Sequence, residues 1–322
     1  MARAALLLFL AGCAFGEIDY TGKTCPCPSE YGCTTNGTCC LPAIRGENFR
    51  VAWTAPNTIR FEWDPIGDAA SFGAYEMRLG TPNGVERITA ERNPQFAYFD
   101  LPLISDDNIP VDSAMVFDLE PSTPYWGELQ AIDNTGCTWV SPAVHTTTAV
   151  APLSDQVPLL IFDETLDLTW LTGPDGVSLL VTDEARASCN SSFLEWTPTM
   201  TNQDTNVQLY SLGMPLAPVG EWLDSSAFIE YRIARNVPSY WARVVLSVFD
   251  PAIQEGRHAR LEAMSLPGDD AYHTVQVPIR VLDRGAGQPA YTPSDTLHRF
   301  LVGFSPWEAN ATMRVDCVRI RW

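Results

Sequence analysis

The sequence predicts an all-β protein with two β-sandwich domains behind a disulfide-rich segment. Its 25 prolines and 21 glycines separate short apolar runs rich in Val, Thr, Tyr and Trp, a pattern typical of strands and turns. Long stretches at helical spacing are missing. The 322 residues, 46% of them hydrophobic, suffice for two ordinary cores. We therefore expect sandwiches over residues 48–150 and 151–322, preceded by a cysteine-rich segment over residues 13–47.

The amino terminus has the pattern of an export signal. Arg3 is followed by an apolar run that is too short to span a bilayer but suits the core of a signal peptide. The run ends in Leu10-Ala11-Gly12-Cys13, which resembles the lipobox of bacterial lipoproteins. The resemblance implies that residues 1–12 are removed as a signal peptide and that Cys13 receives the lipid. An ordinary signal peptide with a coincidental cysteine is the alternative.

The same resemblance implies where the protein is located. Acyl chains on Cys13 would be its anchor to a membrane, because no later run approaches the ~18 apolar residues of a membrane span. The expected protein is therefore an exported, membrane-anchored lipoprotein at the outer membrane or the cell surface.

The charge of the chain bears on its partners. Asp+Glu number 39 against 20 Lys+Arg, which gives a formal net charge of -19. Such a surface repels phosphate backbones, so a nucleic-acid partner is not expected.

The cysteines predict disulfides. Of the nine, setting Cys13 aside for lipid leaves eight that can pair. Five crowd into a stretch almost without apolar residues, so crosslinks must hold it together. Because five is odd, one needs a distant partner, for which Cys137 is the nearest, and Cys189 would then pair with Cys317. A zinc site is the alternative, but adjacent cysteines without a nearby histidine fit tetrahedral ligand spacing poorly. The five are Cys25, Cys27, Cys33, Cys39 and Cys40.

Two alternating segments open the middle domain. Residues 58–63 place Ile59, Phe61 and Trp63 on one face of a strand, and Asp64-Pro65 ends it. A second strand over residues 73–79 is followed by a Thr-Pro-Asn-Gly turn. Its inward residues are expected to be Tyr75, Met77 and Leu79.

A corner motif identifies the kind of sandwich. The segment Leu119-Glu-Pro-Ser-Thr-Pro-Tyr125 resembles the corner before the penultimate strand of fibronectin type III domains, and Trp63 matches that family's buried tryptophan. The resemblance implies that Tyr125 turns its ring inward and bonds its hydroxyl to nearby backbone. It also implies a spacer or docking module without chemistry of its own. The departure from the family is an irregular stretch over residues 87–113, which we expect to be an elaborated loop.

The carboxy-terminal domain contains clearer strand patterns. Ile229, Tyr231 and Ile233 alternate with Glu230 and Arg232, which predicts a strand with one buried and one polar face. Strands are expected over residues 227–235, over 241–249 as the neighbour of that strand, and over 272–278, 297–304 and 313–322.

These strands resemble the galactose-binding-like jelly rolls used as carbohydrate-binding modules, through the aromatic-rich pair, a Val-x-Val-Pro edge and an aspartate on the final strand. The resemblance implies a structural calcium held by Asp163, Glu164 and Asp316. We expect Asp316 on the face of Val318 and Ile320, where a buried carboxylate needs a cation or hydrogen-bond donors. Backbone donors or an arginine partner are the alternative to calcium, and no other cofactor is expected.

A carbohydrate ligand would need aromatic rings that stack on sugar faces and polar groups that orient hydroxyls. Large aromatics are more often core residues than binding platforms, so each candidate has a structural alternative. The candidates are Trp222, Arg232, Tyr240, Trp241, His298 and Trp307.

No catalytic signature is present. The four histidines are scattered, and neither a His-Glu-x-x-His helix nor a Gly-x-Ser-x-Gly elbow occurs. We therefore expect a non-enzymatic surface protein whose C-terminal sandwich binds carbohydrate or a surface protein, as in adhesion. A structural component of an envelope or extracellular assembly is one alternative. A polysaccharide-active hydrolase is another, because a glycosidase carboxylate pair is recognised only by its separation in space.

Overall fold

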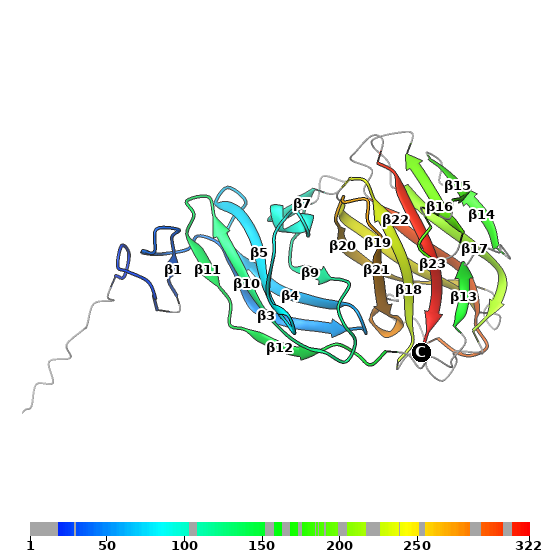
Figure 1. Cartoon of the computed structure of the whole chain (residues 1–322), viewed down its shortest axis with the longest axis horizontal. Coiled ribbons are helices and arrows are strands. Elements are labelled where there is room, and N and C mark those ends of the chain that lie inside the picture. Colours follow the sequence, from blue (N-terminus) through cyan, green and yellow to red (C-terminus); the bar gives the residue numbers. More distant parts are fainter. Residues whose placement is uncertain are drawn as a thin grey trace, which may run out of the picture.

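The computed structural model is built almost wholly from strands, which confirms the all-β prediction. Figure 1 shows the cysteine-rich segment at one end, a sandwich in the middle and a second sandwich at the other end. Within the described part of the chain, no helix is long and apolar enough to cross a membrane. The structure describes residues 19–28, 30–102, 108–151, 158–162, 168–172, 176–183, 185, 187–189, 191–198, 205–216, 226–237, 239–250, 255–283, 291–304 and 311–322.

The middle domain consists of two antiparallel sheets. The smaller sheet has the order β3-β4-β9, and the larger runs β2-β1-β11-β10-β5-β6, with β12 also paired to β10. The smaller sheet contains β3 (Arg45–Thr54), β4 (Ile59–Ile66) and β9 (Ser113–Val116). The larger contains β1 (Gly32–Cys33), β2 (Cys39–Cys40), β5 (Phe72–Thr81), β6 (Gly84–Ile88), β10 (Pro124–Asp133), β11 (Thr138–Val140) and β12 (Val144–Thr147).

The irregular stretch before β9 forms an elaborated connection, as expected. It consists of a 3-10 turn and a short two-stranded pair. Asn93 caps the turn by accepting a hydrogen bond from the Gln95 N–H, and Phe96 is fully buried in the middle core. The elements are η1 (Pro94–Ala97), β7 (Asp100–Pro102) and β8 (Asn108–Pro110).

Both faces predicted from alternation are buried in the middle core. The ring of Trp63 on β4 lies edge-on to that of Tyr75 on β5, with 5.2 Å between centroids. Tyr125 forms the expected corner, because its Oη accepts a hydrogen bond from the Glu120 N–H at 2.9 Å. Two packed sheets, a buried tryptophan and this corner make a fibronectin type III-like sandwich. The buried residues of the two faces are Ile59, Phe61, Trp63, Tyr75, Met77 and Leu79.

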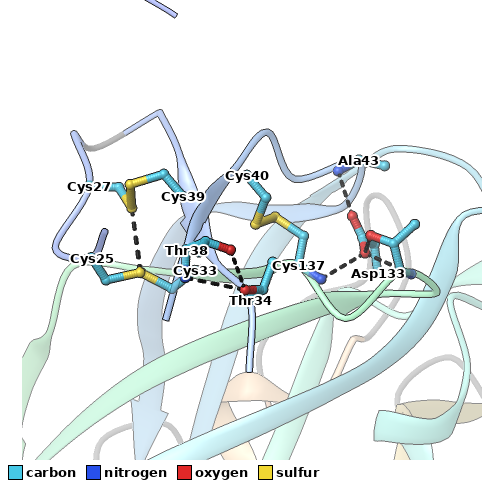
Figure 2. The surroundings of a disulfide bond; sticks show 11 residues. Cys25, Cys27, Cys33, Thr34, Thr38, Cys39, Cys40, Ala43, Asp133 and Cys137 are labelled. Atoms are coloured by element: carbon cyan, nitrogen blue, oxygen red, sulfur yellow. Dashed lines mark hydrogen bonds between the residues drawn. A yellow bond between two sulfur atoms is a disulfide. The ribbon is translucent and has the colours of Figure 1, made fainter. Parts of the chain in front are cut away.

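The cysteine-rich segment is crosslinked and attached to the larger middle sheet. Its strand β1 pairs with β11, so the segment extends that sheet. Asp133 fixes the residues that lead out of this segment. One of its carboxylate oxygens accepts a hydrogen bond from the Ala43 N–H at 3.2 Å, and the other accepts one from the Cys137 N–H at 3.0 Å (Figure 2). The pairs to Cys137 and between Cys189 and Cys317 are those expected from the sequence. The four disulfides are Cys25–Cys33, Cys27–Cys39, Cys40–Cys137 and Cys189–Cys317.

The carboxy-terminal domain is a larger sandwich of six and five strands. The chain passes back and forth between the sheets, which is the jelly-roll arrangement. A short 3-10 turn, η3 (Ile279–Val281), follows β21. The six-stranded sheet contains β13 (Leu159–Phe162), β15 (Gly176–Thr182), β16 (Ser192–Pro198), β18 (Phe228–Arg235), β21 (His273–Pro278) and β23 (Met313–Arg321). The five-stranded sheet contains β14 (Leu168–Thr172), β17 (Thr205–Pro215), β19 (Ser239–Asp250), β20 (Glu255–Leu266) and β22 (Thr296–Phe304).

One expected strand pairing is wrong. Residues 241–249 were expected beside 227–235, but β18 pairs with β21 and β23, while β19 lies in the other sheet between β22 and β20. The short connection after β18 therefore crosses from one sheet to the other. The buried face of β18 is as predicted, with Ile229, Tyr231 and Ile233 in the core between the sheets.

The two sandwiches share one apolar interface. Four residues of the middle domain belong to the same buried cluster as the core of the carboxy-terminal sandwich: Trp53, Ala55, Met115 and Phe117. Through this joint packing, the second sandwich is held against the middle domain.

Polar contacts complete the interface. The Asn57 N–H donates to the Gln276 Oε1 at 2.9 Å, and the side chains of Asn93 and Ser265 are hydrogen-bonded to each other. The Thr274 N–H donates to an oxygen of Asp118 at 3.1 Å. Directional polar contacts of this kind, of which the Asn93–Ser265 pair is buried, help to fix the register in which the domains meet.

Candidate functional site

The six ligand-binding candidates do not form one site. Arg232 lies on β18 in the six-stranded sheet, whereas Tyr240, Trp241 and His298 lie on β19 and β22 in the five-stranded sheet. His298 is also separated from Tyr240 and Trp241, because β22 pairs the neighbours of His298 with residues 247–248, far along β19 from Tyr240. His298 is exposed. Trp222 and Trp307 lie outside the described residues, as do the side chains of Tyr240 and Trp241.

Arg232 lines a pocket on the outer face of the six-stranded sheet. Its neighbours on β18, Tyr231 and Ile233, point into the core, so alternation directs Arg232 outward. The pocket has a volume of about 250 Å³. It is lined by Leu160, Phe162, Ser188, Cys189, Arg232, Cys317 and Arg319.

Arg232 and Asp316 lie opposite each other on β18 and β23 and together hold the peptide of Ser188. The Arg232 Nη1 donates to the Ser188 carbonyl oxygen at 2.6 Å. The Ser188 and Cys189 N–H groups donate to the Asp316 Oδ2 at 2.8 and 3.1 Å. The disulfide from Cys189 to Cys317 fixes the same segment to β23. One wall of the pocket is therefore held by two side chains and a crosslink.

A β-bulge turns Asp316 to the outer face. Glu230 on β18 lies opposite Arg319 on β23, and Arg232 lies opposite Asp316. Two residues along β18 therefore correspond to three residues along β23. Cys317 at this point has a φ of 53°, in the left-handed region. As a result Val318 and Ile320 are in the core while Asp316 is not. The expectation that Asp316 shares their face is therefore wrong, because the extra residue shifts the alternation.

The donors around Asp316 bear on the expected calcium. Its Oδ1 accepts from the Cys317 N–H at 2.8 Å, so with Ser188 and Cys189 three backbone N–H groups face a carboxylate that is 1% exposed. These donors compensate the buried charge, which is the alternative to a cation. Asp163 and Glu164 lie outside the described residues, so the calcium site stays a prediction for them.

Beside the pocket lies a buried polar network that reaches the domain interface. Glu230 is 5% exposed and pairs with Arg319, whose Nε donates to it at 2.6 Å, and with Arg321. The Gln276 Nε2 donates to the other oxygen of Glu230 at 2.6 Å. Because Gln276 also accepts from Asn57, this network joins the middle domain to the pocket-lining Arg319.

Sequence reasoning missed Leu160, Ser188 and Arg319 as parts of the pocket. Arg319 and Arg321 alternate with Val318 and Ile320, so a polar outer face on β23 could have been predicted. Nothing in the local pattern of Leu160 or Ser188 places them beside it, because they reach the pocket from distant parts of the chain.

The similarity of this chain to known proteins is confined to solved structures. No protein-family model matches it, and no curated protein matches it. A structure of carbohydrate-binding modules from the β-sandwich superfamily is 12% identical, with 87% of this chain and 98% of that chain covered and a TM-score of 0.34. The family 30 carbohydrate-binding module of a cellulase of Clostridium thermocellum is 11% identical, with coverages of 51% and 96% and a TM-score of 0.41. The fn3 domain of human contactin 1 is 16% identical, with coverages of 34% and 81% and a TM-score of 0.25. TM-scores this low give no information about the ligand of this chain.

Proposed function

We propose that this chain is a non-catalytic surface protein whose carboxy-terminal sandwich binds a carbohydrate in the pocket around Arg232. The observation that carries the proposal is the pocket itself, in which a guanidinium, a serine hydroxyl and the exposed Leu160 lie together at the outer face of the six-stranded sheet. Sugars are bound by such combinations of directional polar groups and apolar surface. The volume of about 250 Å³ is just below the range of drug-sized ligands, so a single sugar residue suits it.

The contacts of Asp316 support a binding role over a catalytic one. A general acid or base must be free to exchange a proton with a substrate. Three backbone N–H groups already donate to the Asp316 carboxylate, which is buried, so its role is structural.

We further propose that Cys13 carries lipid and anchors the protein to the outer membrane or the cell surface. The cysteine-rich segment that follows Cys13 in the chain lies at the end of the molecule opposite the carboxy-terminal sandwich (Figure 1). An anchor there would hold the binding domain away from the membrane. The intact mass of membrane-extracted protein tests this, since removal of residues 1–12 and an added acyl mass are expected, and an unmodified full-length mass would contradict it.

A glycan array probed with the full exported chain tests the carbohydrate proposal. Binding to a defined set of saccharides is expected, and it should fall sharply for the Arg232→Gln variant. The matched control is Arg321→Gln, which removes one positive charge from the same sheet but does not line the pocket. An empty array, together with capture of a surface protein by the wild-type chain, would replace the carbohydrate with a protein partner.

A further inference from the structure

Within the residues that the structure describes, Arg232 differs from three other arginines of its sheet in having no carboxylate partner. Arg319 and Arg321 on the adjacent strand are both paired with Glu230, and the buried Arg314 is paired with Asp270. Among the described residues, Arg232 forms no ion pair, and its one close partner is the neutral Ser188. The pocket therefore has a cation that forms no ion pair with any described carboxylate.

The hydrogen bonds of Arg232 leave one particular edge of its guanidinium open. Nη1 donates to the Ser188 carbonyl oxygen at 2.6 Å and lies 3.5 Å from its hydroxyl oxygen. Within the described chain, Nε and Nη2 make no hydrogen bond. These two nitrogens form the side of the fork that binds a carboxylate with two parallel N–H···O bonds. Because Ser188 holds the third nitrogen, this edge is fixed in orientation before a ligand arrives.

The rest of the pocket suits the ring that would carry such a carboxylate. The Ser188 hydroxyl can exchange hydrogen bonds with a sugar hydroxyl, and Arg319 also lines the pocket. Leu160 is 42% exposed beside it, which offers an apolar surface to the C–H face of a pyranose.

We infer that this pocket selects an acidic saccharide, with the carboxylate of a hexuronate residue bound by the Nε and Nη2 edge of Arg232. The inference rests on the proposed carbohydrate function and names the chemical class of its ligand. A neutral sugar would leave the guanidinium edge without a charged acceptor, so the pocket should discriminate against it.

Titration of the full exported chain with pairs of methyl glycosides, followed by NMR, tests the inference. The pairs are methyl glucuronide with methyl glucoside and methyl galacturonide with methyl galactoside, and sodium acetate at equal ionic strength serves as the third arm. The affinity for at least one uronide should be about tenfold or more above that for the matching neutral glycoside, and also above that for acetate. Arg232→Gln should remove this preference. Arg232→Lys, which keeps the charge but loses the fork, should retain only part of it, and Arg321→Gln should leave it unchanged.

The outcomes separate the inference from the function on which it rests. Equal binding of uronides and neutral glycosides would overturn the acidic ligand but leave carbohydrate binding in place. Binding of acetate as tight as that of the uronides would reduce the pocket to an anion site and overturn the saccharide. If no glycoside binds, both fail. Thermal unfolding of each variant checks that the fold persists, because Arg232 also holds Ser188; if Arg232→Gln unfolds, the Arg232→Lys comparison decides.

Discussion

Tyr125 stabilises the middle domain through one hydrogen bond at its corner. The bond between its Oη and the Glu120 N–H ties the start of β10 to the preceding turn. Tyr125→Phe keeps the buried ring and leaves that N–H without its partner. We expect a loss of about 1 to 2 kcal/mol in the free energy of unfolding, measured by urea denaturation. A variant as stable as the wild type would show that the corner bond contributes nothing.

His273 sits between two carboxylates at the domain interface. Its Nδ1 is 2.8 Å from Asp118 on the middle domain, and its Nε2 is 3.1 Å from Asp269. A neutral imidazole has one N–H and can donate to only one of them, whereas the imidazolium donates to both. The hydrogen bond to Asp118 is the main reason that the pKa of His273 is raised above its ordinary value, against the opposing effect of burial.

This raised pKa predicts that alkaline conditions weaken the interface. Because the folded state binds the proton more tightly than the unfolded chain, the contribution is complete below the ordinary histidine pKa of about 6.5. It is lost as the pH rises through the higher folded-state value. The urea midpoint of the wild type minus that of His273→Gln should therefore be larger at pH 5.5 than at pH 9. A difference that does not change with pH would contradict this assignment.

At the scale of elements, the cysteine-rich segment depends on its attachment to the middle sheet. Cys40 and Cys137 are 97 residues apart, so their bond restricts a long loop in the unfolded chain. Replacing both with alanine should lower the free energy of unfolding by about 2 to 4 kcal/mol and expose the segment to proteolysis. Unchanged resistance to limited proteolysis would mean that β1, β2 and the Asp133 contacts suffice.

Asp133 provides a separate test of that attachment. Burial alone would raise the pKa of its carboxyl group, but the Thr135 hydroxyl and the N–H groups of Ala43, Thr135 and Cys137 lower it overall. Its stabilising contribution is therefore present above the ordinary aspartate pKa of about 3.9 and is lost as the pH falls through the lower folded value. In Asp133→Asn, the free energy of unfolding should therefore fall less steeply toward acid pH than in the wild type. The same dependence on pH in both proteins would contradict this.

Alternation of residue type predicted the faces of individual strands but not their irregularities. The faces of β4, β5 and β18 could be predicted because one side of each strand packs in a core and the period of two is unbroken. The bulge at Cys317 could not, since a left-handed conformation at a cysteine has no sequence signal of the kind that glycine gives. That single residue decides whether Asp316 lies on the core face or on the outer face of the sheet.

Pairing between strands was harder to predict than their faces. A short connection after β18 suggests a hairpin, yet β18 and β19 belong to different sheets. The candidate site depends on the same long-range information. The polar face of its strand indicated Arg232 as a candidate. The residues that line the pocket with it, Leu160, Ser188 and Arg319, come from three other segments that only the jelly roll brings together.

For the whole molecule, the interface predicts that the two sandwiches unfold together. Gln276 bridges Asn57 of the middle domain and the buried Glu230, so Gln276→Leu leaves both partners short of a hydrogen bond. The loss should be about 1 to 3 kcal/mol, with a less cooperative transition by calorimetry. Gln130→Leu on β10 of the middle domain is the matched control. Two separate transitions in the wild type would show that the shared core does not couple the domains.

The location of a bound saccharide tests the central claim most directly. A crystal structure of the chain with a saccharide identified on the array should show the sugar on the outer face of the six-stranded sheet, with a charged group against Arg232 and its ring beside Leu160. A sugar held instead on the five-stranded sheet, near Tyr240 and Trp241, with the Arg232 pocket empty, would contradict it.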